Sequence, residues 1–340
     1  MGGHMKVRWC WAAVTVTALV LTAAQPAGAA VATAAKKLDV PWGLSFLPDK
    51  SALVTERSGR ILSIKGTTVT QVGKVAVEPG SESGLLGIAV SPNYNTDKYV
   101  YVYHSTDEDN RISRMKLGGT PEPLVTGIPL ASVQVGGRLA FGPDGFLYAS
   151  TGDATNGDDA QDTKTLGGKI LRMTKDGKPA PGNPFGNLVY SYGHRNVQGF
   201  AWDGQKRMYA SELGQQDLDE LNRIESGKNY GWPECEGPCS NPKYTKPLLT
   251  WPTDQASPSG VAIYKNSIYV AALRGERMWK VPLNANGSVG KPTAVFKGTY
   301  GRLRTAVAGP DGKLWITTTN RDGNGGTVRK DDDKVFRTDG

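Results

Sequence analysis

Arginine and amide side chains recur at the ends of short apolar segments of this chain. Arg195 and Asn196 precede one such segment, Arg274 follows another, and Arg302 and Arg304 begin a third. The planar guanidinium group binds carboxylates through two parallel hydrogen bonds. Because each arginine flanks a predicted strand, we expect them to converge on one opening that suits a small polyanionic ligand. Solvated surface charge is the alternative interpretation.

A second polar group combines Glu220 with Tyr230. Glu220 lies in the segment 219–222, and Tyr230 lies in the segment 229–233. A carboxylate together with backbone carbonyl oxygens is the ligand chemistry that Ca²⁺ prefers. The sequence therefore favours a calcium site here, and a charged loop without a metal is the alternative.

Several common chemistries have no motif in the sequence. There is no serine or cysteine nucleophile motif, no glycine-rich phosphate loop between a strand and a helix, and no histidine cluster. Beyond the first 30 residues the histidines are His104 and His194, and neither stands beside a recognisable nucleophile. The net charge is +8, but lysine and arginine are scattered without a block of like charge. This pattern argues against a nucleic-acid partner.

The N-terminal segment has the features of an export signal. Residues 1–4 resemble a cloning remnant, and residues 5–29 read as a signal peptide. Lys6 and Arg8 form its charged start, an apolar run follows, and Ala27-Gly28-Ala29 is a cleavage site of the A-x-A type. We therefore predict secretion. A membrane anchor is the alternative, but the run is too short and broken for a stable one.

Two cysteines remain after the predicted cleavage. Cys235 and Cys239 flank a Gly-Pro turn. In an oxidising compartment this spacing favours a small-loop disulfide. A metal site would need further soft ligands, which the neighbouring sequence does not offer.

One sequence unit recurs six times after the predicted signal peptide. Each copy has a small residue, alternating apolar residues and often Pro-Asp-Gly, followed by an alternating strand; the copies are residues 43–49, 87–92, 138–145, 199–204, 260–263 and 305–312. Period-two patterning with Asp-Gly turns indicates antiparallel hairpins. The spacing of 44 to 61 residues is typical of propeller blades. We predict that residues 30–340 form one all-β domain, a six-bladed β-propeller of four-stranded antiparallel blades, with the termini sharing a blade.

These segments together resemble the soluble pyrroloquinoline quinone (PQQ) dependent sugar dehydrogenases. The resemblance is to the glucose/sorbosone dehydrogenase-like family, and especially to its aldose sugar dehydrogenase branch. It runs from about residue 40 to residue 338, and its most specific segments are 83–87, 136–138, 192–196, 219–222, 229–233 and 301–304.

The resemblance implies a cofactor site at the propeller mouth. Residues implied to bind or flank PQQ are Glu82, Arg195, Asn196, Arg274, Arg302 and Arg304, with Arg274 at a position where the family often has lysine. The backbone carbonyls of Gly214 and Gln215 would hold a catalytic Ca²⁺, and Glu220 with Tyr230 would match a separate structural Ca²⁺ site. The implied partners are a sugar-like or anionic small molecule and an electron acceptor.

The chain departs from the family at the general base. The family has histidine in a His-Asn-Gly-Gly-Arg segment, whereas Gln134 and Val135 stand at its first two positions here. Glutamine has no titratable proton near neutral pH. Three hypotheses follow: a dehydrogenase that uses Asp153 or Glu82 as its base, a repurposed propeller with non-redox chemistry, and a propeller that only binds an anion. The candidate catalytic positions are Gln134, Arg195 and Asp153.

Overall fold

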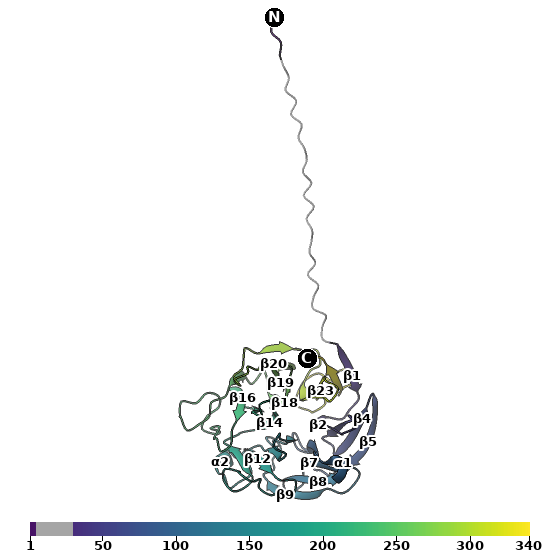
Figure 1. Ribbon diagram of the computed structural model, residues 1–340, viewed down its shortest axis with the longest axis vertical. Coiled ribbons are helices and arrows are strands. Elements are labelled where there is room, and N and C mark those ends of the chain that lie inside the picture. Colours follow the sequence, from purple (N-terminus) through teal and green to yellow (C-terminus); the bar gives the residue numbers. More distant parts are fainter. Residues whose placement is uncertain (5–29) are drawn as a thin grey trace.

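The structure is a computed structural model that describes residues 1–4 and 30–340. The signal peptide predicted at residues 5–29 lies outside the described residues. Within them the strands form six separate four-stranded sheets, all antiparallel, arranged around a central axis (Figure 1). The predicted six-bladed β-propeller is therefore confirmed.

Each of the first five blades is built from four consecutive strands, ordered from the axis outward. Blade 1 is β2 (Pro41–Phe46), β3 (Ala52–Glu56), β4 (Arg60–Lys65) and β5 (Thr68–Lys74), and blade 2 is β6 (Leu85–Val90), β7 (Tyr99–Ser105), β8 (Asn110–Lys116) and β9 (Glu122–Ile128). Blade 3 is β10 (Leu139–Phe141), β11 (Leu147–Ser150), β12 (Lys169–Met173) and β13 (Val189–Tyr192). Blade 4 is β14 (Val197–Trp202), β15 (Met208–Glu212), β16 (Leu218–Ile224) and β17 (Leu249–Pro252), and blade 5 is β18 (Pro258–Tyr264), β19 (Ser267–Ala272), β20 (Arg277–Pro282) and β21 (Thr293–Val295).

Blade 6 closes the ring by joining the two ends of the domain. Its strands are β22 (Leu303–Ala308), β23 (Leu314–Thr318) and β24 (Val335–Thr338), and β1 (Val31–Ala35) pairs with β24 as the outermost strand. Figure 1 shows β1 beside β23 and the C-terminus. Since closure removes the open sheet edge between the first and last blades, this shared blade stabilises the ring.

Glycines of the repeated unit allow the innermost strands to approach one another closely. A side chain at Gly43 would collide with the backbone of β6, and one at Gly199 would collide with the backbone of Ser259 in β18. Near the axis six strands share little space, so a residue without Cβ is required there. This is the physical reason for the small residue at the start of the unit.

The hydrophobic core is divided among the interfaces between neighbouring blades. Six buried clusters can be distinguished in the described residues, and each joins residues of two adjacent blades, with Trp42 of blade 1 added to the cluster between blades 2 and 3. Tyr209 of blade 4, for example, packs in one cluster with Val270 of blade 5. Two short helices, α1 (Tyr94–Asp97) and α2 (Gly157–Gln161), lie in connecting segments. None of the described helices has the length and apolar character needed to cross a bilayer.

Candidate functional site

The residues singled out from the sequence lie at one end of the propeller, here called the mouth end. It is the end at which the innermost strands begin. Glu82, Gln134, Arg195, Asn196 and Arg302 precede or begin such strands. Asp153, Gly214, Gln215 and Arg274 lie in connections between the second and third strands of their blades, which antiparallel pairing places at the same end. The topology therefore gathers them from blades that are far apart in the sequence.

A hydrogen-bonded group links Glu82, Gln134 and Asn196 across three blades. Glu82 Oε2 accepts the backbone N–H of Gln134 at 2.8 Å and lies 3.4 Å from Asn196 Nδ2. Asn196 Oδ1 in turn accepts the backbone N–H of Gly136 at 3.1 Å. Asn196 is buried, whereas Glu82 and Gln134 remain partly exposed. The structure thus brings these three predicted residues together.

Gln134 is held in a left-handed backbone conformation with φ of 60°. Its carbonyl accepts the N–H of Ala154 at 3.1 Å, and its side-chain Oε1 accepts the N–H of Thr155 at 3.1 Å. The opposing residue is Gly152, where any Cβ would collide with the Gln134 carbonyl. Because the backbone is fixed on both sides, the side chain at position 134 has a defined place at the mouth.

Asp153 lies beneath Gln134 and is sealed from solvent. Its Oδ2 accepts the indole N–H of Trp232 at 2.7 Å, and its Oδ1 accepts the N–H of Thr155 at 3.0 Å. Burial raises the pKa of the Asp153 carboxyl above its ordinary value. With both oxygens occupied, Asp153 is better placed to position Trp232 and the loop than to take a proton from a ligand.

Arg195 reaches from blade 4 toward the loop that carries Gly214. Its Nη1 donates to the carbonyl of Gly214 at 2.6 Å, and its guanidinium lies 5.5 Å from the Trp232 ring centroid. Its Nε is buried and has no hydrogen-bond partner among the described residues. Arg195 therefore retains an unused donor at the mouth.

Arg302 and Arg304 share one carboxylate, that of Asp322. Arg302 Nη2 and Arg304 Nη2 lie 2.9 and 3.3 Å from Asp322 Oδ2. All three side chains are buried. Burial lowers the pKa of Arg304 to about 10, and its Nε lacks a partner in the described part of the chain. Two guanidinium groups on one carboxylate leave an excess positive charge that favours an anionic ligand.

Sequence reasoning missed several residues that organise the mouth. Asp322 lies in the connection between β23 and β24, and Arg57 donates to its backbone carbonyl at 3.2 Å. Trp232 lies in the segment 229–233, and nothing in that segment indicates its hydrogen bond with Asp153. Nothing in the local sequence marks Arg57 or Asp322, because folding creates their contacts. Asp322 pairs with Arg302 and Arg304, 20 and 18 positions away, and contacts Arg57, 265 positions away.

Arg274 differs from the other predicted ligands. It is exposed on the turn between β19 and β20. No hydrogen bond or ion pair joins its guanidinium to the described residues of the mouth. Arg274 therefore lies at the mouth end, outside the hydrogen-bonded cluster of the described residues.

Glu220 and Tyr230 line a small cavity of about 10 Å³ together with Glu212 and Glu236. That volume is close to the space of a single water molecule. Glu220 Oε1 accepts the N–H of Gly237 at 2.7 Å, and its Oε2 accepts Asn222 Nδ2 at 2.8 Å. Burial, reinforced by the charge of Glu212, raises the pKa of Glu220 to about 8.

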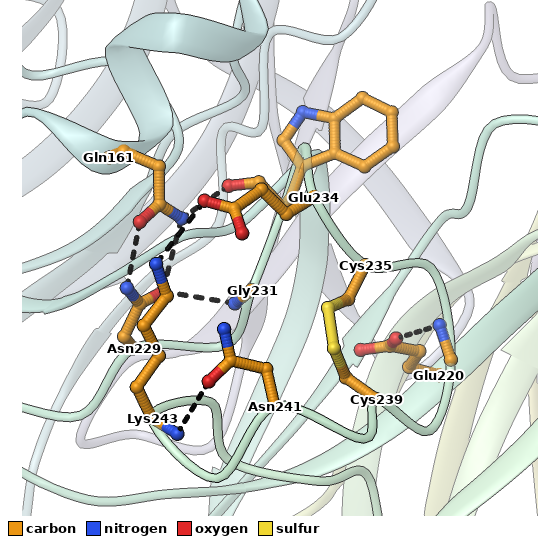
Figure 2. Close-up of a disulfide and its surroundings, with 11 residues drawn as sticks. Gln161, Glu220, Asn229, Gly231, Glu234, Cys235, Cys239, Asn241 and Lys243 are labelled. Carbon is orange, nitrogen blue, oxygen red and sulfur yellow. Dashed lines mark hydrogen bonds and ion pairs between the residues drawn. A yellow bond between two sulfur atoms is a disulfide. The ribbon is translucent and has the colours of Figure 1, made fainter.

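The predicted disulfide is present beside this cavity. Cys235 and Cys239 are bonded, with Cα atoms 5.7 Å apart, and Figure 2 shows the bridge next to Glu220. Glu236, which lies within the bridged loop, accepts four backbone N–H groups of residues 215–218 on one oxygen, at 2.8–3.0 Å. The bridge therefore restrains a carboxylate that shapes the loop carrying Gly214 and Gln215.

No recognisable nucleophile stands beside either histidine in the sequence, and the structure places a buried serine beside each of them. His194 Nε2 lies 2.9 Å from Ser191 Oγ and its Nδ1 lies 2.9 Å from Glu212 Oε2, an arrangement that resembles a hydrolase triad. His104 likewise contacts Ser113 at 2.9 Å. Ser191 and His194 are both 0% exposed, so no substrate reaches them. The sequence did not reveal these contacts because strand pairing, not a motif, creates them.

Comparisons with known proteins agree with the fold. The family model described as "Glucose / Sorbosone dehydrogenase" matches residues 38–329. The solved PQQ-bound form of aldose sugar dehydrogenase from Streptomyces coelicolor has 47% identity, covers 93% of this chain and 99% of its own, and has a TM-score of 0.87. Aldose sugar dehydrogenase YliI of Escherichia coli is 27% identical over 88% of this chain and 92% of its own, and quinoprotein glucose dehydrogenase B of Acinetobacter calcoaceticus is 26% identical over 88% and 87%. The chain therefore belongs to the glucose/sorbosone dehydrogenase family.

Proposed function

We propose that the protein binds PQQ and Ca²⁺ at the mouth end and oxidises a sugar or a related alcohol, passing electrons to a separate acceptor. The observation that carries the proposal is the placement of Arg195, Arg302 and Arg304 at the mouth end, where the Nε atoms of Arg195 and Arg304 are buried without a partner in the described residues. The PQQ-bound Streptomyces relative supports the choice of cofactor. PQQ carries three carboxylates, which matches a site rich in guanidinium groups.

The residues present fit this cofactor. The buried Nε atoms of Arg195 and Arg304 have no partner within the described residues. A buried donor without a partner costs free energy, and a carboxylate at the mouth would remove that cost. Arg195, Arg302 and Arg304 would hold the cofactor's acidic groups, and Glu82 and Asn196 would flank it. Bound PQQ would supply the two-electron oxidant.

The Ca²⁺ ligands would be largely backbone oxygens. Gly214 presents its carbonyl at the mouth, where one lone pair already accepts Arg195. A carbonyl oxygen has a second lone pair for a cation, and Gln215 would contribute its own carbonyl. Among residues 1–4 and 30–340, no three His, Cys, Asp or Glu side chains form a metal-binding group. The second Ca²⁺ proposed at Glu220 and Tyr230 would fill the small cavity there.

Glu82 is the best candidate for the proton acceptor. It is partly exposed at the mouth, and only its Oε2 is used by Gln134 and Asn196. Asp153, the other candidate, is only 2% exposed and has both oxygens bonded. Gln134 can orient a hydroxyl group by hydrogen bonding but cannot take its proton.

A second function is favoured by one observation, the glutamine at position 134. A propeller that keeps the arginines and lacks the histidine could bind an anionic small molecule without oxidising anything. The two functions differ in turnover but share the ligand-binding arginines, so binding and turnover must be measured separately.

The test is calorimetric titration with PQQ in the presence of Ca²⁺, followed by a dye-linked assay with a panel of aldoses. We expect PQQ to bind, Arg195→Gln to weaken that binding at least tenfold, and slow dye reduction with at least one sugar. Arg223→Gln, on a partly exposed arginine near the other end of blade 4, is the matched control. Absence of PQQ binding would refute the dehydrogenase proposal, and binding without turnover would favour the second function.

We further propose that the protein is exported from the cell. The predicted signal peptide and the Cys235–Cys239 disulfide both fit an exported protein, since disulfides persist in oxidising compartments. Detection of the mature chain in culture supernatant, beginning near residue 30, is the corresponding measurement.

A further inference from the structure

A second pocket opens at the far end of the propeller, where the innermost strands finish. Its volume is about 550 Å³, and residues from all six innermost strands line it. Aromatic side chains of Phe46, Phe141, Phe200 and Trp202 contribute much of its wall, and the remaining lining residues are mainly alanine, valine, leucine and isoleucine. The pocket is therefore an apolar well on the axis, opposite Gln134.

Arg138 lies among the residues lining this well, at the mouth-side start of β10, and it is 7% exposed. Its guanidinium stands 4.2 Å from the Trp42 ring centroid. Nε donates to the carbonyl of Gln198 at 2.8 Å, and Nη1 donates to Thr305 Oγ1 at 3.1 Å. Nη2 has no hydrogen-bond partner within residues 1–4 and 30–340. Arg138 therefore forms the polar inner end of an otherwise apolar pocket.

The charge of Arg138 is not neutralised by the protein. No ion pair to a carboxylate is found for it in the described chain, whereas neighbouring Arg304 is paired with Asp322. Burial, together with the positive charge of Arg304, lowers the pKa of Arg138 to about 9. A buried cation without a counter-charge is costly, and an anion entering the well would reduce that cost.

The shape and charge of the well define the ligand. Each innermost strand contributes three residues to the lining. Three strand residues extend about 10 Å, which is comparable with the length of a medium-length alkyl chain. Arg138 is the one cation among the lining residues, and the carboxylate of Asp203 toward the strand ends is paired with Arg207 at 2.6 Å. A single unpaired cation deep inside favours a monoanion over a polyanion such as PQQ.

We propose that this axial well binds a medium-chain alkanoate, with the carboxylate against Arg138 and the alkyl chain along the apolar strands. The site lies at the opposite end of the axis from the proposed cofactor site. It does not depend on the dehydrogenase function, and both ligands would bind at the same time.

Octanoate is the probe, measured by isothermal titration calorimetry with PQQ-free protein and with protein saturated with PQQ. We expect one octanoate per chain in both states and at least tenfold weaker binding of octan-1-ol, which lacks the charge. Ala308 is exposed in the lining, so Ala308→Trp should obstruct the well without burying a new side chain. It should weaken octanoate binding at least tenfold, and Ala308→Ser should leave it unchanged.

Arg138→Met, which keeps the side-chain length, should remove the preference for octanoate over octan-1-ol. If that variant does not fold, the Ala308 pair and the comparison of the two probes still decide the question. No octanoate binding at millimolar concentration would overturn the proposal. Equal binding to the wild-type and Ala308→Trp proteins, or displacement of octanoate by PQQ, would overturn it as well and would point to the mouth end.

Discussion

Placing histidine at position 134 is the sharpest test of the proposal that Gln134 stands where the family has its general base. The backbone there is held by Glu82 through the Gln134 N–H and by Ala154 through the carbonyl, so a new side chain inherits a fixed starting point. Histidine tolerates the left-handed conformation better than most residues. An imidazole nitrogen can also accept the Thr155 N–H that Gln134 Oε1 now accepts. We therefore expect Gln134→His to fold normally.

The expected gain follows from the chemistry of a general base. A positioned general base contributes about 10²–10⁴-fold to a rate, or about 2.7–5.4 kcal/mol of barrier. We propose Glu82 as the proton acceptor of the wild-type protein, so part of this factor is already present, and we expect the variant to oxidise sugars at least about tenfold faster. The rate should also acquire a dependence on deprotonation near the histidine pKa of about 6.5.

The Gln134→His substitution should not be combined with Val135→Asn. Val135 is 1% exposed and lies in the core cluster between blades 2 and 3. An asparagine there would bury an amide in apolar surroundings, at a cost of about 1–3 kcal/mol. The His-Asn pair that the family resemblance implies therefore cannot be introduced as a unit without repacking that interface.

The assay is dye-linked aldose oxidation with PQQ and Ca²⁺ saturating, with PQQ occupancy measured in the same samples. Gln134→Asn is the control, since it keeps an amide and should give no gain. An unchanged rate for Gln134→His with PQQ demonstrably bound would mean that the pocket as a whole has been rebuilt. A wild-type rate already similar to that of ordinary relatives would mean that position 134 does not carry the base.

Three further predictions concern stability. Because the pKa of Glu220 is raised, the folded protein without Ca²⁺ holds a proton that the unfolded chain releases, so stability should fall as pH rises from about 4.5 to 8. Ca²⁺ should therefore raise Tm more at pH 8.5 than at pH 6. The Glu220→Gln variant should abolish that difference. Gly152→Ala should lower the free energy of unfolding by more than about 3 kcal/mol in a denaturant titration, because its Cβ would overlap a backbone carbonyl. Gly204 has open space around it, so the control variant Gly204→Ala should change the free energy of unfolding by less than about 1 kcal/mol. Replacing Cys235 and Cys239 by serine should cost about 2 kcal/mol of unfolding free energy; if thermal unfolding shows no change, the bridge does not restrain the loop.

The mouth end and the far end of the axis pose different electrostatic problems. At the mouth, Arg302 and Arg304 have Asp322 as a partial counter-charge, so the apo protein tolerates them. Arg138, deeper on the same axis, has Trp42 and two neutral acceptors instead. The difference explains why two separate ligands are proposed for one axis.

The sequence by itself determined the architecture and the face that carries the site. Six copies of one unit with period-two patterning predict blades, because each copy encodes a hairpin that buries its faces only against its neighbours. The positions of Arg195 and Arg302 before innermost strands followed from the same repeat. The disulfide was also predictable, since Cys235 and Cys239 are close in the chain.

Only the tertiary structure decided which polar residues meet. The link between Glu82 and Asn196 joins residues 114 positions apart, and the Arg57 contact with Asp322 spans 265 positions. No local pattern encodes such pairs, since they depend on where the ring closes and how far each loop reaches. The same holds for burial: Asp153 and Glu82 look equivalent as bases in the sequence, but packing seals Asp153 under Trp232 and leaves Glu82 at the opening. The repeat therefore encodes the blades, and the closure of the ring determines which polar side chains come into contact.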